Sequence, residues 1–181
     1  MSDPVPTLET QRLQLRSFSM DDLALHHQLI GSDPQVTWHG KALTLEESEA
    51  ALKKRIHHWE QHGFGMWAVE EKATGSLLGH AGLQMLEDTD QVELGYYFGR
   101  PAWGRGVATE AGTACLRYGF ESLNLDHVMA VVRPENLASQ NVLSKLGFRH
   151  SHVAHHYDFD VQVWRLDRND FKPNDTYYRQ R

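Results

Sequence analysis

The chain has 181 residues, enough for one domain with a substantial core and too few for two domains to be expected. Its composition, with 40% hydrophobic and 23% charged residues, is typical of globular proteins. The formal net charge is −6 and the basic residues are scattered along the chain, which argues against a nucleic-acid-binding protein.

Further features of the chain favour a cytoplasmic protein. The single cysteine, Cys115, excludes an internal disulfide framework, and its place on an apolar helix face indicates a buried thiol rather than a nucleophile. The N-terminus lacks the basic and apolar regions of a secretory signal, and no apolar run reaches the roughly 18 residues of a membrane span. Twelve histidines raise the question of a metal site, but they lack the spacing of zinc motifs, so no metal is expected.

The first half of the chain predicts a short tail, a strand and two helices. Residues 1–9 are expected to be the tail, and the alternation over 12–16 predicts a strand. A helix is expected from Ser19, as N-cap, to about residue 30. Thr44 and Glu47 match a capping box at the start of a second helix, which ends near residue 63.

The second half predicts strands and helices that complete one mixed sheet. Short turns separate three strand patterns at 65–71, 77–86 and 92–98, so these strands are expected to be antiparallel neighbours. Next, the pattern predicts a helix from Gly104 to about Ser122, a strand at 128–132, a helix that Gly147 ends, and strands at 148–155 and 159–166. The fold class is therefore α/β (α+β), a single domain with one strand–helix–strand crossover.

The stretch 92–109 combines a strand, a glycine turn and a helix start. Val92, Leu94, Tyr96 and Phe98 alternate with the other strand residues, and Gly104 and Gly106 precede residues at helical spacing. Free backbone N–H groups and the dipole at a helix N-terminus favour an anion there. The stretch therefore predicts a site for a phosphate-bearing ligand.

Two common phosphate motifs fit this turn poorly. A P-loop needs Lys followed by Ser or Thr after its last glycine, whereas Val107 and Ala108 follow Gly106. A dinucleotide site needs a third glycine where Thr109 stands. Asp126 has the spacing of its ribose-binding acid, but it precedes a strand and so lies at the wrong end of the sheet.

Together with the segment 136–148, the turn resembles the acetyl-CoA site of the GNAT N-acetyltransferases, most closely the RimJ/RimL-like branch of ribosomal-protein N-terminal acetyltransferases. Segments 10–16, 63–69 and 78–83 are similar to three strands of that branch, in the same order. The resemblance implies a GNAT-like sheet whose two central strands splay apart, a domain at residues 10–172 and a C-terminal tail at 173–181.

The resemblance assigns the cofactor to three groups of residues. Backbone N–H groups of the glycine turn are expected to cradle the CoA pyrophosphate, at Gly104, Arg105, Gly106, Val107 and Ala108, with Trp103 and Thr109 beside them. Backbone groups of Tyr97 and Phe98 are expected to pair with the pantetheine, and Asn136 and Ser139 to reach the cofactor. The signature often has Gln or Arg where this chain has Pro101, a departure that other members of the branch tolerate and that leaves a side-chain contact at this corner open.

Two residues are the catalytic candidates. Glu93, an acid within an apolar strand, is the candidate base, with a solvent-exposed strand position as the alternative. In the RimL-like branch, the serine that matches Ser139 lies near the CoA sulfur as a hydrogen-bond donor or general acid. Tyr157 is the reserve candidate for that acid, because a tyrosine has this role in other branches.

The expected activity is acetyl transfer from acetyl-CoA to a primary amine by direct attack in a ternary complex. A protein N-terminal α-amine is the first choice by resemblance; a small amine (a polyamine, an amino acid or an antibiotic) is the alternative. A non-catalytic acyl-CoA-binding regulatory domain is the rival from another class. No nucleic-acid or membrane partner is expected, and a homodimer is left open.

Overall fold

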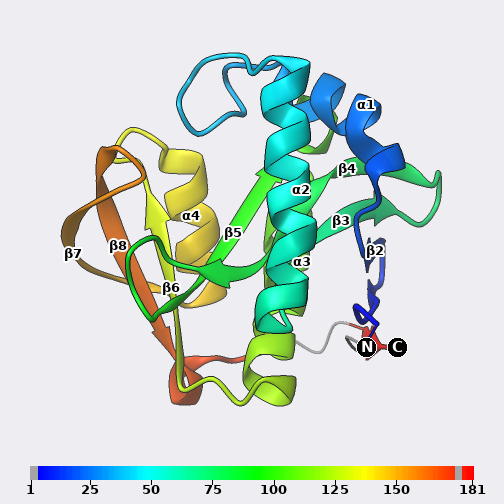
Figure 1. Ribbon diagram of the computed structural model, residues 1–181. Helices are drawn as coiled ribbons and strands as arrows, with labels where there is room; N and C mark the ends of the chain where they lie inside the picture. The colour runs from blue at the N-terminus through cyan, green and yellow to red at the C-terminus, as the bar shows by residue number, and fades with distance from the viewer. Residues whose placement is uncertain (1–3, 174–176) are drawn as a thin grey trace.

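The computed structural model describes residues 4–173 and 177–181, and its centre is a mixed sheet of nine strands (Figure 1). The strand order is β7-β8-β6-β5-β4-β3-β2-β1-β9. The strands are β1 (Leu8–Thr10), β2 (Leu13–Arg16), β3 (Met66–Glu71), β4 (Ser76–Met85), β5 (Val92–Phe98), β6 (His127–Val132), β7 (Arg149–His156), β8 (Phe159–Asp167) and β9 (Tyr178–Gln180). All neighbours are antiparallel except β5 and β6, which the crossover helix makes parallel. The expected fold class is confirmed.

Helices cover both faces of this sheet. The helices are α1 (Leu23–His26), α2 (Leu45–His62), α3 (Val107–Arg117) and α4 (Leu137–Leu146), with π turns extending α1 to Gly31 and α3 to Ser122. In Figure 1, α2 crosses in front of the sheet and α3 lies behind it. None of the helices in residues 4–173 and 177–181 is long and apolar enough to cross a membrane.

Local signals set the ends of these helices as expected. The Thr44 hydroxyl accepts from the Glu47 N–H at 3.1 Å and the Glu47 carboxylate accepts from the Thr44 N–H at 2.7 Å, which confirms the capping box. Gly63 and Gly147 end α2 and α4 with φ of 71° and 95°, the left-handed conformation that favours glycine. Cys115 is fully buried in α3, so the expected structural thiol is confirmed.

The edge of the sheet includes two strands that the sequence does not reveal. β1 pairs with β9 through Leu8 opposite Gln180 and Thr10 opposite Tyr178, so the sheet extends beyond the expected domain limits at residues 10 and 172. Each strand has three residues, too few for an alternation to stand out from a loop. Residues 1–3 and 174–176 of the expected tails lie outside the described residues.

The two faces of the central strands have different neighbours. Gln84, Glu93, Gly95 and Tyr97 lie on the face that α1 and α2 cover, and Leu94, Tyr96 and Phe98 lie on the α3 and α4 face. A Cβ at Gly95 would come within 2.6 Å of the Met66 Cε, and β4 and β5 pair without a register shift. Gly95 therefore allows close packing and marks no bulge.

Candidate active site

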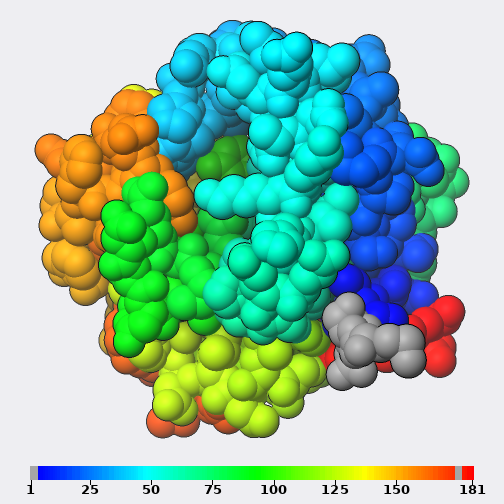
Figure 2. Space-filling model, in the orientation of Figure 1, coloured from blue at the N-terminus to red at the C-terminus, as the bar shows by residue number. Residues whose placement is uncertain are grey.

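A cavity of about 1000 Å³ runs along β5 and the start of α3. Its walls come from the segment 34–40, the β5 and β6 strands, the glycine turn, α4 and the β7–β8 turn. Figure 2 shows the opening as a hollow between α2 in cyan, the light-blue segment before it and the orange β7–β8 region, with green residues of the central strands at its floor. All catalytic and cofactor candidates except Arg105 line this cavity.

The glycine turn has the backbone that an anion cradle needs. Gly104 and Gly106 have φ of 70° and 76°, and Gly106 is the N-cap of α3. The first N–H groups of the helix, at Val107, Ala108 and Thr109, have no intrahelical acceptors. Nothing lies within 4 Å of the position of a Cβ on Gly104, so the turn is open to a ligand. The turn therefore fits a pyrophosphate bound through backbone N–H groups.

Side chains from distant parts of the chain, Arg12 between β1 and β2 and Glu71 at the end of β3, hold this turn in place. The Arg12 guanidinium pairs with the Glu110 carboxylate at 2.6 Å and donates to the Arg105 carbonyl at 2.9 Å. The Arg105 side chain pairs with Glu71, outside the cavity. The guanidinium of Arg12 thus lies next to the turn and adds positive potential there, a contribution that no local motif predicts because Arg12 is about 90 residues away in the chain.

The two central strands separate beside the cavity. β5 and β6 are paired at one position, Glu93 opposite Met129. The Gly99 N–H donates to the Leu78 carbonyl, so by antiparallel alternation the N–H and C=O of Tyr97 point to β4, and those of Tyr96 and Phe98 point to the gap. The expectation of a Tyr97 backbone contact with the pantetheine therefore does not fit the register.

Phe98 presents only half of its backbone to this gap. The Trp103 indole Nε1 donates to the Phe98 carbonyl at 2.7 Å, which leaves the Phe98 N–H facing β6. The Tyr96 N–H and C=O face the same gap. An extended ligand arm such as pantetheine could form hydrogen bonds with the Phe98 N–H and with the Tyr96 N–H and C=O, in place of a neighbouring strand.

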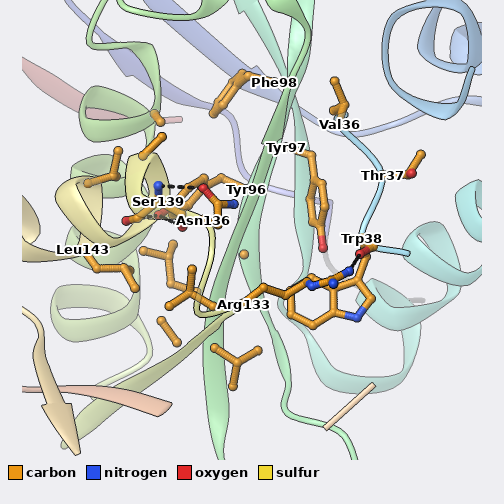
Figure 3. A pocket seen from close by; sticks show the side chains of 18 of the residues that line it. Val36, Thr37, Trp38, Tyr96, Tyr97, Phe98, Arg133, Asn136, Ser139 and Leu143 are labelled. Carbon is orange, nitrogen blue, oxygen red and sulfur yellow. Dashed lines mark hydrogen bonds between the residues drawn. The ribbon is translucent and has the colours of Figure 1, made fainter. Parts of the chain in front are cut away.

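α4 begins at the cavity with two polar residues. Asn136 is its N-cap, as expected, and its Oδ1 accepts from the Ser139 N–H at 3.0 Å. The Ser139 hydroxyl lies 2.8 Å from the Tyr96 hydroxyl, and either can donate. Burial raises the pKa of Tyr96 to about 12, so this phenol keeps its proton. Figure 3 shows Tyr96, Ser139 and Asn136 together on one side of β5.

Glu93 lies on the other face of β5 and is 2% exposed, so the solvent-exposed alternative is wrong. Burial raises the pKa of Glu93 to about 7, and nearby Glu87 adds to this rise. Hydrogen bonds from Tyr157 and Gln84 oppose the rise, since they stabilise the carboxylate. Both donors bind Oε1, Gln84 at 2.7 Å, which leaves Oε2 without a protein donor among the described residues. Such a carboxylate has an oxygen free to accept a proton near pH 7.

Tyr157 reaches Glu93 from the turn between β7 and β8. Tyr157 and Asp158 have φ of 50° and 69°, the conformation of a tight two-residue hairpin turn. The Trp38 indole donates to the Tyr157 carbonyl at 3.0 Å, and the Glu87 carboxylate accepts from the Tyr157 N–H. The hydrogen bond from Trp38 thus links the segment 34–40 to the hairpin turn that carries Tyr157 to Glu93. The Tyr157 hydroxyl donates to Glu93, on the face opposite Ser139.

The side chains on the two faces of β5 lie on opposite sides of the strand gap. Tyr97 and Trp38 lie on one side of the strand and Ser139 lies on the other, as Figure 3 shows. A ligand held in the gap between β5 and β6 would therefore have the Glu93 carboxylate on one side and the Ser139 hydroxyl on the other. This arrangement suits a group transfer in which one side takes up a proton and the other side gives one.

The sequence patterns do not identify three further residues of the site. Tyr96, Gln84 and Trp38 contact the candidates Ser139, Glu93 and Tyr157. For Gln84 the cross-strand register with Glu93 is a readable signal, because short turns fix the pairing of β4 and β5. Trp38 lies in an irregular segment, and nothing in its local sequence indicates its partner.

Comparisons with known proteins extend these observations. A family model described as an acetyltransferase (GNAT) domain matches residues 12–149. The chain is 32% identical over 175 residues to the uncharacterized N-acetyltransferase p20 of Bacillus licheniformis, covering 91% of this chain and 98% of that protein. It is 35% identical over 72 residues to the ribosomal protein uS5-alanine N-acetyltransferase of Escherichia coli, covering 40% of this chain and 37% of that one. The crystal structure of an acetyltransferase from Agrobacterium tumefaciens is similar with a TM-score of 0.81 and 28% identity, covering 92% of this chain and 96% of that one.

Proposed function

This chain belongs to the GNAT acetyltransferase family, and on that premise we propose that it transfers the acetyl group of acetyl-CoA to an α-amine. The observation that carries the proposal is Glu93, a buried carboxylate with a pKa of about 7 and a free oxygen beside the strand gap. A base of this strength suits an α-ammonium, whose pKa is about 7.7–8.0, far better than a lysine ammonium at about 10.4. The proposed cofactor residues are those of the glycine turn, the Tyr96 and Phe98 edge of β5, Asn136 and Ser139.

In the proposed reaction the cofactor supplies an acetyl thioester, and residues of this chain move the protons. Glu93 Oε2 accepts, directly or through a water molecule, the proton that the acceptor ammonium loses. The neutral nitrogen then attacks the thioester carbonyl carbon, and one N–H group that faces the gap, that of Tyr96 or that of Phe98, stabilises the charge on its oxygen. As the carbon–sulfur bond breaks, the Ser139 hydroxyl gives its proton to the thiolate, and the second proton that the acetylated nitrogen loses returns to Ser139, directly or through water.

Tyr96 is proposed to assist Ser139 as a positioning residue. Its hydroxyl, protonated at neutral pH, donates to the Ser139 oxygen while the Ser139 proton points toward the sulfur. Tyr157, the reserve candidate for the acid, donates to Glu93 instead, so its proposed role is to orient the base. The two tyrosines thus serve opposite faces of β5.

Ser139→Ala is expected to lower kcat by about 100-fold, the lower range for loss of a general acid, with little change in the Kd of CoA. Tyr96→Phe is expected to have a smaller effect, because Ser139 keeps its own proton. Steady-state kinetics with acetyl-CoA, and with an acetyl thioester of a more acidic thiol, measure the loss of kcat in each variant. A better leaving group needs less protonation, so the Ser139→Ala defect should shrink with it. An equal defect with both thioesters would contradict the role as acid.

Similarity to a relative and the size of the cavity support two classes of acceptor. The local similarity to the ribosomal protein uS5-alanine N-acetyltransferase supports the RimJ/RimL-like branch and a protein N-terminal α-amine, but over 40% of this chain only. A small amine is the second candidate, because a cavity of about 1000 Å³ has room for one beside the cofactor.

Release of free thiol from acetyl-CoA, measured with a panel of peptides, amino acids and other small amines at pH 7.5, tests the function. Turnover with α-amines and little with matched ε-amines is the expected result. A binding-only domain would bind CoA and release no thiol with any amine.

A further inference from the structure

A second, smaller cavity of about 180 Å³ lies beside the proposed acceptor end of the large one. Its walls are Ala51, Lys54, Arg55 and His58 of α2, together with Met66 and Gln84. Gln84 also lines the large cavity and donates to Glu93, so the two cavities meet at this residue. The small cavity is therefore placed to receive a part of the acceptor other than its amine.

Arg55 is the unusual residue of this cavity. Its Nη1 is fully buried and has no hydrogen-bond partner in residues 4–173 and 177–181, and no carboxylate of these residues lies within 4.0 Å of its side chain. Burial lowers the pKa of Arg55. By contrast, Arg16 and Arg100 pair with acids at 2.7 and 2.5 Å. Arg55 is partly buried, and a partly buried guanidinium without an anion is unfavourable, so an arriving anion relieves the cost.

The groups around Arg55 offer no compensating charge. His26 and His80 lie near it and bond to each other at 2.9 Å; burial lowers the pKa of His26 to about 3, so both histidines are neutral at physiological pH. His58 donates to the Phe64 carbonyl through Nδ1 and accepts from a backbone N–H through Nε2, which makes it neutral as well. Lys54, the other cation of this cavity, has no acid within 4.0 Å among the described residues.

The acceptor region thus has a negative end and a positive end. Glu93, Glu87 and Asp158 lie at one end of the large cavity. Tyr97 lies near both ends, because the charges of both Glu93 and Arg55 act on its hydroxyl. His80 stacks on the Tyr97 ring with centroids 5.1 Å apart and fixes its position. A polyamine would place positive charge against Arg55 and Lys54, whereas a molecule with an ammonium and an anion complements both ends.

We infer that the acceptor is an α-amine that also carries a carboxylate, and that Arg55, with Lys54, binds this carboxylate while Glu93 faces the amine. The inference rests on the proposed acetyl transfer and narrows its acceptor. The carboxylate has two possible sources, the α-carboxylate of a free amino acid and the side chain of an acidic residue next to a peptide N-terminus. Arg suits this role because its planar fork binds a carboxylate through two hydrogen bonds.

The test compares matched acceptors that differ in one negative charge. Free amino acids are paired with their carboxamides, and short peptides with Asp at the second position are paired with the same peptides carrying Asn. The wild-type enzyme is expected to have a kcat/KM at least about 30-fold higher for the anionic member of one pair type, as for a buried charge pair. Which pair type shows the preference identifies the source of the carboxylate.

Two variants of Arg55 and one control assign the preference to this residue. Arg55→Gln is expected to erase it by raising KM for the anionic acceptor about 30-fold, with kcat and the neutral acceptor little changed. Arg55→Glu is expected to reverse it. Lys53→Gln removes a cation from the neighbouring, exposed position of α2, where Lys53 pairs with Glu49, and should change nothing.

Calorimetry with CoA and thermal unfolding separate binding from folding. Arg55→Gln should bind CoA as the wild type does and unfold at the same or a higher temperature, because it removes an unpaired, partly buried charge. A wild-type enzyme that uses neutral and anionic acceptors equally, or an Arg55→Gln variant that retains the preference, would overturn the inference while the acetyl transfer stands. If no amine releases thiol from acetyl-CoA, the proposed function fails and this inference fails with it.

Discussion

Glu93→Gln is expected to lower kcat/KM by about 10²- to 10⁴-fold, the range for loss of a general base. The amide oxygen of Gln can accept the hydrogen bonds from Tyr157 and Gln84 that now bind Oε1, so the geometry should survive. What disappears is the oxygen that accepts the proton. Asp88→Asn is the matched control, because it removes an exposed acid of the nearby β4–β5 turn.

The pH dependence sharpens this prediction. Because burial raises the pKa of Glu93 to about 7, wild-type kcat/KM should fall as the pH drops through about 7 and the base becomes protonated. The acceptor ammonium titrates near 8 and also contributes to this limb. In Glu93→Gln only the limb of the acceptor should remain. A variant with wild-type activity and an unchanged profile would remove Glu93 from the mechanism.

The stability of Glu93→Gln should rise above that of the wild type at high pH, whereas its activity should fall. The folded-state pKa of Glu93 lies above the usual value of 4.5, so folding favours the protonated form. The protonated carboxyl therefore contributes stability that is fully present below about pH 4.5, the pKa in the unfolded chain. This stability is lost as the pH rises through about 7, the pKa in the folded protein. Glu93→Gln should therefore be more stable than the wild type at pH 8, by up to about 3 kcal/mol, and equal to it at pH 4. Chemical unfolding at both pH values measures the difference.

The sequence predicts the elements whose signals are local. The limits of β5 coincide with the alternation over 92–98, and the turn at Gly104 and Gly106 has the positive φ that only glycine adopts at little cost. The capping box of α2 and the glycine end of α4 are equally local. These features depend on residues a few positions apart, which is why one sequence suffices to predict them.

The chemistry of the site depends on contacts that are far apart in the chain. Tyr157 is 64 residues from Glu93, and its orientation depends on a hairpin turn and on Trp38 from a third segment. The direction of the Tyr97 backbone depends on which edge of β5 pairs with β4, a choice that side-chain alternation leaves open. Arg55 looks like any solvated helix cation in the sequence; only the packing of α2 on the sheet buries its Nη1.

Gly106→Val tests the other half of the site, the proposed pyrophosphate cradle. Gly106 has φ of 76°, and within 4 Å a Cβ there would meet only the Arg12 guanidinium nitrogen, at 3.6 Å. The free protein therefore has room for the side chain and suffers mainly backbone strain, roughly 1–2 kcal/mol. With CoA present, the branched side chain would occupy the space through which phosphate oxygens approach the N–H groups of α3. We expect the Kd of CoA to rise at least about 100-fold, the loss of two charge-assisted hydrogen bonds.

A control variant at a second glycine distinguishes the effect of backbone strain from the effect of blocking the phosphate site. Gly75, in the turn between β3 and β4, has φ of 67° and nothing within 4 Å of its Cβ position, and it does not line the cavity. Gly75→Val should therefore destabilise the fold about as much as Gly106→Val while binding CoA normally. Calorimetry with CoA and chemical unfolding of both variants give the two quantities. Unchanged CoA affinity in Gly106→Val would disprove the cradle, and an equal loss in both variants would trace the effect to strain. A loss confined to Gly106→Val would place the pyrophosphate at the start of α3.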